Sequence, residues 1–268
     1  MTDHPDREDL LSLARRVGLE AADLVRASRP SGRVAVAATK SSETDVVTEL
    51  DRRTEALIRE RILAVRPDDG FVGEEGEHVV GTSGVEWVVD PIDGTVNFVY
   101  GIGAYAVSIA AQVDGEVVVG HVVDVPARQE WGAIRGRGSW RYDGDERTVL
   151  TAPIPDSVAH ALVATGFNYV PAVRARQARA AALLLPQVRD IRRIGSAAID
   201  LCGLAEGRYD AYVEQGLHPW DLAAGGLVAQ ESGIVLSGLD GPPDHRLTMG
   251  AHPSIAEEYF ALVRACGF

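Results

Sequence analysis

The sequence is poor in cysteine, in basic side chains and in long apolar runs. Its two cysteines, Cys202 and Cys266, cannot form a disulfide framework, and neither has a second Cys or a His at the spacing of a zinc site. No apolar run approaches the ~20 residues that a membrane-spanning helix needs. The first nine residues are polar and acidic, without the basic start or the apolar stretch of a signal peptide. We therefore expect a cytoplasmic protein that does not associate with membranes.

Positive charge is scarce as well. The chain has 26 Lys and Arg residues against 39 Asp and Glu residues, which gives a net charge of −13, and Lys40 is its only lysine. Binding to nucleic acid or to anionic lipid requires a basic surface. The charge argues against both kinds of partner, and we expect no direct nucleic-acid binding. An enzyme of this charge that acts on an anionic substrate would need divalent cations at its site.

The rest of the composition is typical of a soluble globular protein. Hydrophobic residues make up 46% and charged residues 24% of the 268 residues, so the chain can form a large core in one domain or in two joined halves. We place the division near residue 150, where the rhythm of the hydrophobic pattern changes. Residues 1–150 are predicted to form an α+β half and residues 151–268 an α/β half.

The first half is predicted to contain two helices followed by a mostly antiparallel sheet. Apolar residues recur at helical spacing over the first ~25 residues. A second helix is expected to begin near Thr44 or Asp45 and to end near Ala64. Strand-like runs follow, one of which covers residues 87–89 and is expected to end at the Asp-Pro pair that comes next. Further on, Asp114-Gly115 between two apolar runs is a strong hairpin signal.

In the second half, predicted strands and helices alternate. Strands are expected over 162–165, 188–194, 209–213 and 234–236, and helices over 172–185, 196–205 and 220–231, with one more helix at the end. Ser254-x-x-Glu257 has the pattern of a capping box, in which Ser254 would be the N-cap of that last helix.

One segment, residues 87–98 (WVVDPIDGTVNF), combines features of a metal site and of a phosphate site. Asp90 and Asp93 are two carboxylates on one tight turn at a strand end, and they can converge on a hard cation. The Ile92 carbonyl between them is available as a ligand because the proline before it interrupts regular strand pairing. Gly94 allows close approach of a ligand, and N–H groups at a helix start attract phosphate. A lone Asp-x-x-Asp would instead be interpreted as an ordinary turn.

Three more acidic positions are unspecific when each is taken alone. Glu74 follows a short predicted strand within an acidic run, and such runs are usually solvated loops. Asp221 lies in the first turn of a predicted helix, where a carboxylate usually caps the helix or interacts with its dipole. Asp51 lies at the margin of an apolar helical stripe, where a solvated edge residue is the ordinary interpretation.

Together these segments resemble the inositol monophosphatase family, part of the lithium-sensitive metal-dependent phosphatase superfamily. The similar segments occur at family-like spacings from about residue 40 to residue 236 and so span nearly the whole chain. In order, they are 45–51, 73–75, 90–95 with 97–98, 194–198 and 220–221. The strings at 97–101 and 192–198 are most similar to the bacterial branch of the family. The resemblance implies a layered αβαβα fold of the inositol monophosphatase and fructose-1,6-bisphosphatase type, which combines α+β and α/β character.

The family pattern, transferred position by position, implies a Mg²⁺ site with two or three ions. Glu74, Asp90 and the Ile92 carbonyl would hold the first ion. Asp90, Asp93 and Asp221 would hold the second, and Glu74 would share a looser third. Two carboxylates ~4 Å apart repel each other by roughly 4 kcal/mol at an effective dielectric constant near 20. Cations remove this repulsion and reverse the charge that an anionic phosphate meets.

The same transfer implies the catalytic residues, which are Asp51, Glu74 and Thr95. Thr95, oriented by Asp51, would help to position and deprotonate the attacking water. Phosphate monoesters hydrolyse so slowly in water that enhancements up to ~10²¹ can be required, and a metal pair meets this demand by activating water and neutralising the leaving oxygen. We predict direct in-line attack by water, with no covalent phosphoenzyme.

The resemblance also assigns contacts to the substrate. Gly94 and Thr95 would present backbone N–H groups to the phosphate, and Asp93, Ala197 and Glu214 occupy positions that contact ring hydroxyls in relatives. The expected substrate-binding residues are Asp93, Gly94, Thr95, Ala197, Glu214 and Asp221. The adjacent pair at 192–193 (Arg-Arg) receives no catalytic role.

The leading functional hypothesis is hydrolysis of a small phosphorylated polyol, inositol 1-phosphate, to inositol and phosphate by a homodimer. Fructose-1,6-bisphosphatase, nucleotide 3′-phosphatase and NADP phosphatase are rival activities that use the same kind of metal site. Glu214 favours a polyol, because a carboxylate accepts hydrogen bonds from hydroxyls but repels a second phosphate. A regulatory protein that binds the transcription machinery is a rival of another class, and the complete set of acidic residues favours the enzyme.

Overall fold

The computed structural model describes residues 6–29, 38–39, 46–47 and 49–268. The first described elements are α1 (Arg7–Ser28), β1 (Ala38–Thr39), β2 (Val46–Val47) and α2 (Glu49–Val65). Asp6 caps α1 by accepting a hydrogen bond from the backbone N–H of Glu8 at 3.0 Å. Among the described residues no helix is both long and apolar enough to cross a membrane.

The larger sheet has seven strands, which pair in sequence order. They are β3 (Gly70–Gly73), β4 (Val85–Asp93), β5 (Ala106–Val113), β6 (Glu116–Asp124), β7 (Gln129–Ile134), β8 (Gly138–Asp143) and β9 (Glu146–Val149). Only β3 and β4 pair in parallel, and the other neighbours are antiparallel. The predicted hairpin joins β5 to β6, with Asp114 and Gly115 both at positive φ.

The smaller sheet has five strands in the order β11-β10-β12-β14-β13. They are β10 (Leu162–Thr165), β11 (Asp190–Arg192), β12 (Ala211–Glu214), β13 (Val235–Ser237) and β14 (Thr248–Ala251). The strand β10 pairs in parallel with both β11 and β12, as crossover helices require, whereas β14 is antiparallel to β12 and β13.

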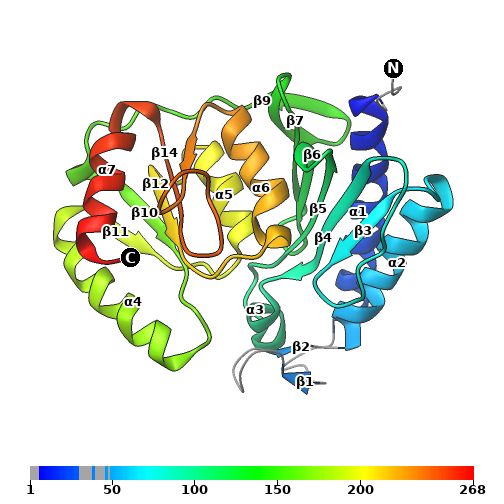
Figure 1. Ribbon diagram of the computed structural model, residues 1–268, viewed down its shortest axis with the longest axis horizontal. Coiled ribbons are helices and arrows are strands. Elements are labelled where there is room, and N and C mark those ends of the chain that lie inside the picture. Colours follow the sequence, from blue (N-terminus) through cyan, green and yellow to red (C-terminus); the bar gives the residue numbers. More distant parts are fainter. Residues whose placement is uncertain (1–5, 30–37, 40–45, 48) are drawn as a thin grey trace.

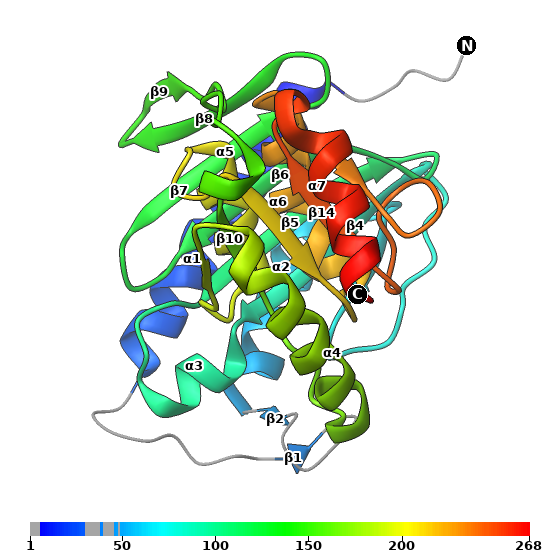
Figure 2. The same cartoon turned by 90° about the vertical axis from the view of Figure 1, so that its left-hand side faces the viewer.

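Helices and sheets alternate in five layers, which Figure 1 shows from right to left. The remaining helices are α3 (Thr95–Tyr100), α4 (Pro171–Leu184), α5 (Ala197–Ala205), α6 (Pro219–Glu231) and α7 (Pro253–Cys266). The pair α1 and α2 covers one face of the larger sheet, α5 and α6 lie between the two sheets, and α4 and α7 cover the smaller sheet (Figures 1 and 2). The order is therefore the αβαβα order that the family resemblance implied.

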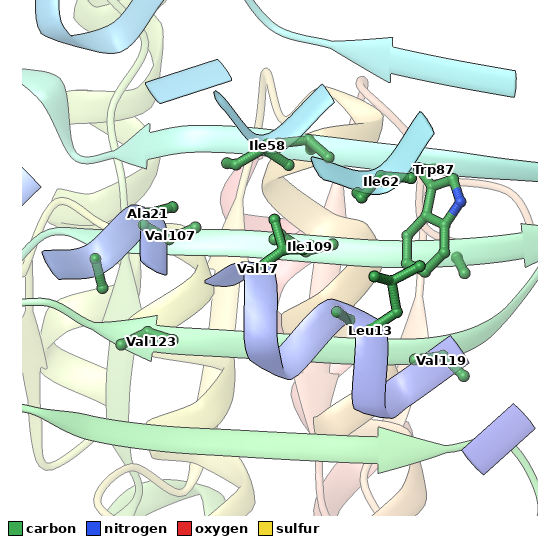
Figure 3. Close-up of a cluster of buried hydrophobic side chains, with 14 of the residues drawn as sticks. Leu13, Val17, Ala21, Ile58, Ile62, Trp87, Val107, Ile109, Val119 and Val123 are labelled. Atoms are coloured by element: carbon green, nitrogen blue, oxygen red, sulfur yellow. The ribbon is translucent and has the colours of Figure 1, made fainter. Parts of the chain in front are cut away.

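Apolar side chains from α1, α2 and the larger sheet form the outer core (Figure 3). Leu13 and Val17 from α1 and Ile58 from α2 face Trp87 of β4 and Ile109 of β5, and all five are at most 5% exposed. The recurrence of these residues at helical spacing in the sequence therefore reflects burial against the sheet.

The central helices pack unusually closely because small residues line them. Every residue of α5 is buried, which is the expected environment of a helix in which Asp200 is the only charged residue. A Cβ atom on Gly225 of α6 would lie 3.2 Å from the carbonyl oxygen of Ala198 in α5. On the other side, a Cβ atom on Gly120 of β6 would lie 2.7 Å from the carbonyl oxygen of Ala224. This packing fixes where α5 and α6 begin, and both begin at the candidate site.

Several element boundaries differ from the sequence-based prediction. The second helix begins at Glu49, and residues 46–47 form a strand; Thr44 and Asp45, where we expected its start, lie outside the described residues. The strand β4 does not end at Asp90 but continues to Asp93, with a shift in register between these two positions.

The second half also departs from prediction at two places. The N-cap of α7 is His252 rather than Ser254, because the His252 ring nitrogen Nδ1 accepts the N–H of Ser254 at 3.1 Å. The sequence analysis missed β14, although it pairs with two neighbours inside the sheet, because only four residues separate an irregular loop from α7.

One ion pair joins α1 to the larger sheet and supplies a test of the fold. Arg15 donates hydrogen bonds from Nε and Nη2 to the carboxylate of Glu130 at 3.0 and 2.9 Å, and His121 Nε2 lies 3.1 Å from Oε2. Burial opposes ionisation of Glu130, but the contacts from His121 and Arg15 outweigh it and lower its pKa from 4.5 to about 2.

Glu130→Gln should therefore reduce the free energy of unfolding at pH 7 by about 2 kcal/mol. A depressed native pKa means that the unfolded state binds the extra proton, so the contribution is complete above about pH 4.5 and disappears as the pH falls toward 2. Urea denaturation at several pH values would measure this. A difference between wild type and variant that stays constant from pH 7 to pH 3 would contradict the assignment.

Candidate active site

The end of β4 and the first turn of α6 bring three carboxylates together. Asp90 and Asp93 come from β4 and Asp221 from α6, and one oxygen atom of each lies within 4.8 Å of the other two. Asp90 and Asp93 are only 2% and 7% exposed. Carboxylate oxygens in such a cluster are the ligands that Mg²⁺ prefers. Three of the five expected metal ligands thus form one compact group.

The other two expected ligands, Glu74 and Ile92, line the same cleft. Glu74 immediately follows β3, and the parallel pairing of β3 with β4 places it beside the site. Its backbone N–H donates to the carbonyl oxygen of Val89 at 3.2 Å. The carbonyl oxygen of Ile92 lies 3.1 Å from the hydroxyl oxygen of Thr95.

Asp93 also holds the start of α5. Its Oδ2 atom accepts hydrogen bonds from the Ser196 hydroxyl at 2.6 Å and from the backbone N–H of Ala198 at 2.7 Å, and Oδ1 accepts the N–H of Ala197 at 3.3 Å. A carboxylate at a helix N-terminus is stabilised by the helix dipole as well as by these bonds. The contact orients Asp93 and places Ala197 against the cleft.

Hydrogen bonds within each turn orient the other two carboxylates of the cluster. The Oδ1 atom of Asp90 accepts the backbone N–H of Ile92 at 3.0 Å, so the side chain folds back over its own strand end. The Oδ2 atom of Asp221 accepts the N–H of His218, the N-cap residue of α6, at 2.6 Å. Each carboxylate is therefore held by the backbone before any ligand is considered.

The cluster is electrostatically strained as a set of bare anions. Burial raises the pKa of Asp93, and its hydrogen bonds to Ser196 and Ala198 only partly oppose this. Burial raises the pKa of Asp221 well above its ordinary value, and the charges of Asp93 and Glu74 raise it further. The carboxylates of this cluster are therefore expected to bind either protons or metal cations, which reduce their mutual repulsion.

Thr95 and Asp51 form a second pair behind the cluster. The Thr95 hydroxyl lies 3.1 Å from Oδ1 of Asp51 and 3.1 Å from the Ile92 carbonyl oxygen. Asp51 is completely buried in α2. The ordinary interpretation of Asp51, a solvated helix edge, is therefore wrong. It does not line the cleft, whereas all the other expected site residues do.

The turn between β4 and α3 depends on glycine. Gly94 has φ +98°, and a Cβ atom there would lie 3.0 Å from the carbonyl oxygens of Ala104 and Gly195. Asn97 holds these neighbours in place, because its side-chain amide donates to Ala104 at 2.8 Å and to the Ile194 carbonyl at 2.9 Å. The segment that precedes α5 therefore lies directly beside the start of α3.

The cleft has a volume of about 520 Å³, and Glu214 is one of the residues that line it. Tyr212, which is fully buried, donates its hydroxyl to Oε2 of Glu214 at 2.7 Å. Gly166 leaves room for the carboxylate, since a Cβ atom there would overlap it. Burial raises the pKa of Glu214 to about 7, although the hydrogen bond from Tyr212 opposes the shift.

Sequence reasoning did not find several residues of the cleft wall. The most distinctive are Phe167, Asn168, Arg193, Gln215 and His245. Arg193 belongs to the Arg-Arg pair to which no catalytic role was assigned, and the others lie in loops without a pattern of their own. Only their position relative to the carboxylates identifies them.

Comparison with known proteins places the chain in a family. Residues 6–267 match the family described as "Inositol monophosphatase family". The chain belongs to this family. "Inositol-1-monophosphatase SuhB" of Mycobacterium tuberculosis is 46% identical over 278 residues, which cover 97% of this chain and 96% of that protein. This inositol monophosphatase family member is accordingly a phosphoric monoester hydrolase.

Two further comparisons agree with the family assignment. The solved structure named "Mycobacterium tuberculosis SuhB" has a TM-score of 0.83 and 44% sequence identity, and the match covers 97% of this chain and 98% of that one. "Nus factor SuhB" of Salmonella typhimurium is 34% identical over 258 residues, which cover 90% of this chain and 94% of that protein. The fold prediction from the family resemblance is confirmed.

The residues of the candidate site fit the metal dependence that the family implies. The donors are carboxylate oxygens, which suit hard divalent cations, and the cluster at Asp90, Asp93 and Asp221 places them within 4.8 Å of one another. The raised pKa of Asp93 and of Asp221, caused first by burial, shows that the negative charges need compensation. Within the described residues this is the only such cluster of three or more potential ligands.

Proposed function

We propose that the chain hydrolyses inositol 1-phosphate to inositol and phosphate in a Mg²⁺-dependent reaction. The observation that carries this proposal is the cluster of Asp90, Asp93 and Asp221 at a cleft, in a chain of this family. The cleft volume of about 520 Å³ lies in the range of small-molecule sites. The substrate would enter with its phosphate toward the carboxylates and its ring toward Glu214.

The proposed metal site uses the predicted ligands. Glu74, Asp90 and the Ile92 carbonyl would hold one Mg²⁺ ion, and Asp90, Asp93 and Asp221 would hold a second; a third would be held more loosely at Glu74. When bound, the ions neutralise phosphate charge and lower the pKa of a water molecule that can attack phosphorus in line. The protein's own part is to hold the carboxylates in place through the hydrogen bonds of β4, α5 and α6.

Thr95 and Asp51 would orient the attacking water. Asp51 Oδ1 accepts the hydroxyl hydrogen of Thr95, and this leaves lone pairs of Thr95 Oγ1 to accept a hydrogen bond from water in the cleft. Because Asp51 is completely buried, water does not compete for its carboxylate. The hydroxyl group of Thr95 therefore has a fixed direction. Asp51 is positioned to accept a proton that the attacking water passes on through the Thr95 hydroxyl.

The two ends of the substrate would meet different groups. Backbone N–H groups of Gly94 and Thr95 would bind phosphate oxygens, as the positive φ of Gly94 opens the turn toward the cleft. At the other end, Glu214 would accept hydrogen bonds from ring hydroxyls, with Asp93 and the Ala197 backbone nearby. A carboxylate at that end favours a neutral polyol over a second phosphate.

A side-by-side assay of phosphate release tests this proposal. Inositol 1-phosphate, fructose 1,6-bisphosphate, a nucleoside 3′-phosphate and NADP would be compared at equal concentration, with Mg²⁺ and with excess EDTA. The proposal predicts the highest kcat/KM for inositol 1-phosphate and no release in EDTA. Preference for any of the other three substrates would replace the substrate assignment, and full activity in EDTA would refute the metal assignment.

Two further expectations are proposed with the activity. We propose a homodimer, for which light scattering should give twice the 28.6 kDa mass of the chain. The name "Nus factor SuhB" of the Salmonella relative is the observation that favours a second role in transcription. The buried, backbone-held carboxylates at Asp90, Asp93 and Asp221 favour the enzyme as the primary role, because a binding protein has no need of them.

A further inference from the structure

Arg193 is a cation in a cleft that five acidic side chains also line. It lies between β11 and α5, and it is the only Arg or Lys among the described residues that line the cleft. The acidic residues that line the same cleft are Glu74, Asp90, Asp93, Glu214 and Asp221. The side chain is exposed, so a ligand in the cleft can reach it.

A glycine makes room for the Arg193 side chain. Gly195 has φ +95°, and a Cβ atom there would overlap Nη1 of Arg193 and lie 3.3 Å from its Cζ. The guanidinium therefore rests against the backbone of Gly195. That backbone also touches the start of α3, since the carbonyl oxygen of Gly195 approaches Gly94. The guanidinium thus lies close to the turn at Gly94.

The charge of Arg193 lowers the pKa of three carboxyl groups near it. It opposes the burial-driven rise in the pKa of Asp93, of Glu214 and of the buried Asp200 behind them. Within the described residues its guanidinium nevertheless makes no hydrogen bond or ion pair, so its N–H donors remain available to a ligand.

Arg192, the residue before Arg193, differs from it in its hydrogen bonds. Arg192 donates from Nη1 to Oδ2 of Asp190 at 2.6 Å and to the Ile191 carbonyl at 2.9 Å, and it does not line the cleft. Two neighbouring arginines of equal charge therefore differ in one respect. Arg192 is used by the protein itself, whereas Arg193 lines the cleft and makes no hydrogen bond within the described residues.

We infer that Arg193 is a specificity-determining residue that donates hydrogen bonds to the hydroxyl oxygens of the polyol, in the cleft that it lines together with the accepting carboxylate of Glu214. This inference rests on the proposed function. A ring hydroxyl can both donate and accept a hydrogen bond, so a guanidinium and a carboxylate in the same cleft complement the two capacities of a polyol. Arginine suits this role because its fork of donors is planar and permanently charged.

The experiment compares two substrates with and without ring hydroxyls in four proteins. Wild type, Arg193→Ala, Arg193→Lys and the matched control Arg192→Ala would be assayed with inositol 1-phosphate and with p-nitrophenyl phosphate, in saturating Mg²⁺. For inositol 1-phosphate, Arg193→Ala should raise KM about tenfold, as expected for loss of one charge-assisted hydrogen bond, and leave kcat within about twofold. For p-nitrophenyl phosphate, both constants should stay within about twofold.

The other variants complete the test. Arg193→Lys should give an intermediate KM, because an ammonium donates but lacks the fork, and Arg192→Ala should match wild type with both substrates. Equal losses of Arg193→Ala with both substrates would overturn the inference, because the guanidinium would then act on the phosphate. An unchanged KM for inositol 1-phosphate would also overturn it. Failure of wild type itself to hydrolyse inositol 1-phosphate would instead refute the proposed function.

Discussion

Asp93→Asn should reduce kcat for phosphate release by about 10³-fold or more while the protein still folds. Asp93 is the one carboxylate that both belongs to the metal cluster and holds the start of α5. Asparagine keeps an oxygen atom to accept the Ser196 hydroxyl and the Ala198 N–H, but it lacks the charge that binds a hard cation. Steady-state kinetics and a Mg²⁺ titration would measure the loss.

Thermal unfolding separates the loss of charge from damage to the fold. Burial raises the pKa of Asp93, so the charged cluster destabilises the metal-free protein at neutral pH, and this effect grows as the pH rises above the ordinary value of 3.8. Without Mg²⁺, Asp93→Asn should therefore unfold at a temperature no lower than wild type. With Mg²⁺, wild type should gain more stability than the variant, because it binds the ion more tightly.

Asp124→Asn is the matched control for this experiment. Asp124 is also a buried carboxylate with a pKa raised by burial, and it accepts the N–H of Ala127 at 2.9 Å, but it does not line the cleft. Its replacement should leave the Mg²⁺ dependence of turnover unchanged. Normal turnover of Asp93→Asn would show that the metal assignment is wrong.

The second large effect is expected at the Thr95–Asp51 pair. Thr95→Val and Asp51→Asn should each lower kcat about 10²-fold, because either change removes the fixed direction of the Thr95 hydroxyl. The effects of substitutions at residues that act as a unit are not additive, so the double variant should be about as slow as the slower single variant. Pre-steady-state and steady-state rates at saturating Mg²⁺ and substrate would measure all three.

Thr54→Val controls for damage to α2. Thr54 lies one turn from Asp51 on the same helix and is completely buried, but it does not line the cleft. This variant should keep its kcat within about twofold even where its stability falls. If the effects of Thr95→Val and Asp51→Asn instead multiply in the double variant, the two residues act independently and the pair has no joint role.

The secondary structure was largely predictable because its signals are local. The helical spacing in α1 and the Asp114-Gly115 hairpin both appear in the structure where the sequence placed them. The start of α2 was misplaced by several residues, because apolar residues of β2 continue the helical spacing without belonging to the helix. β14 was missed because its four residues carry too little pattern to distinguish a short strand from a loop.

The candidate site was predictable only in part. The residues from Asp90 to Gly94 are consecutive, so their chemistry is visible in the sequence, and the family resemblance supplied the distant partners. Tyr212 and Gly166, which hold the Glu214 carboxylate, have no signal of their own. Arg193 was visible as one of two arginines, but only its contact with Gly195 distinguishes it from Arg192.

The sequence by itself determined the kinds of element, the acidic donor set and the family, because these depend on residue type and spacing along the chain. The tertiary structure alone decided that Asp51 is completely buried rather than solvated and that Tyr212 and Gly166 accommodate the Glu214 carboxylate. It also decided which arginine faces the cleft. Packing between distant elements set these relations. The small residues of α5 and α6, for example, let the two helices approach each other closely, and no local pattern encodes such a distance.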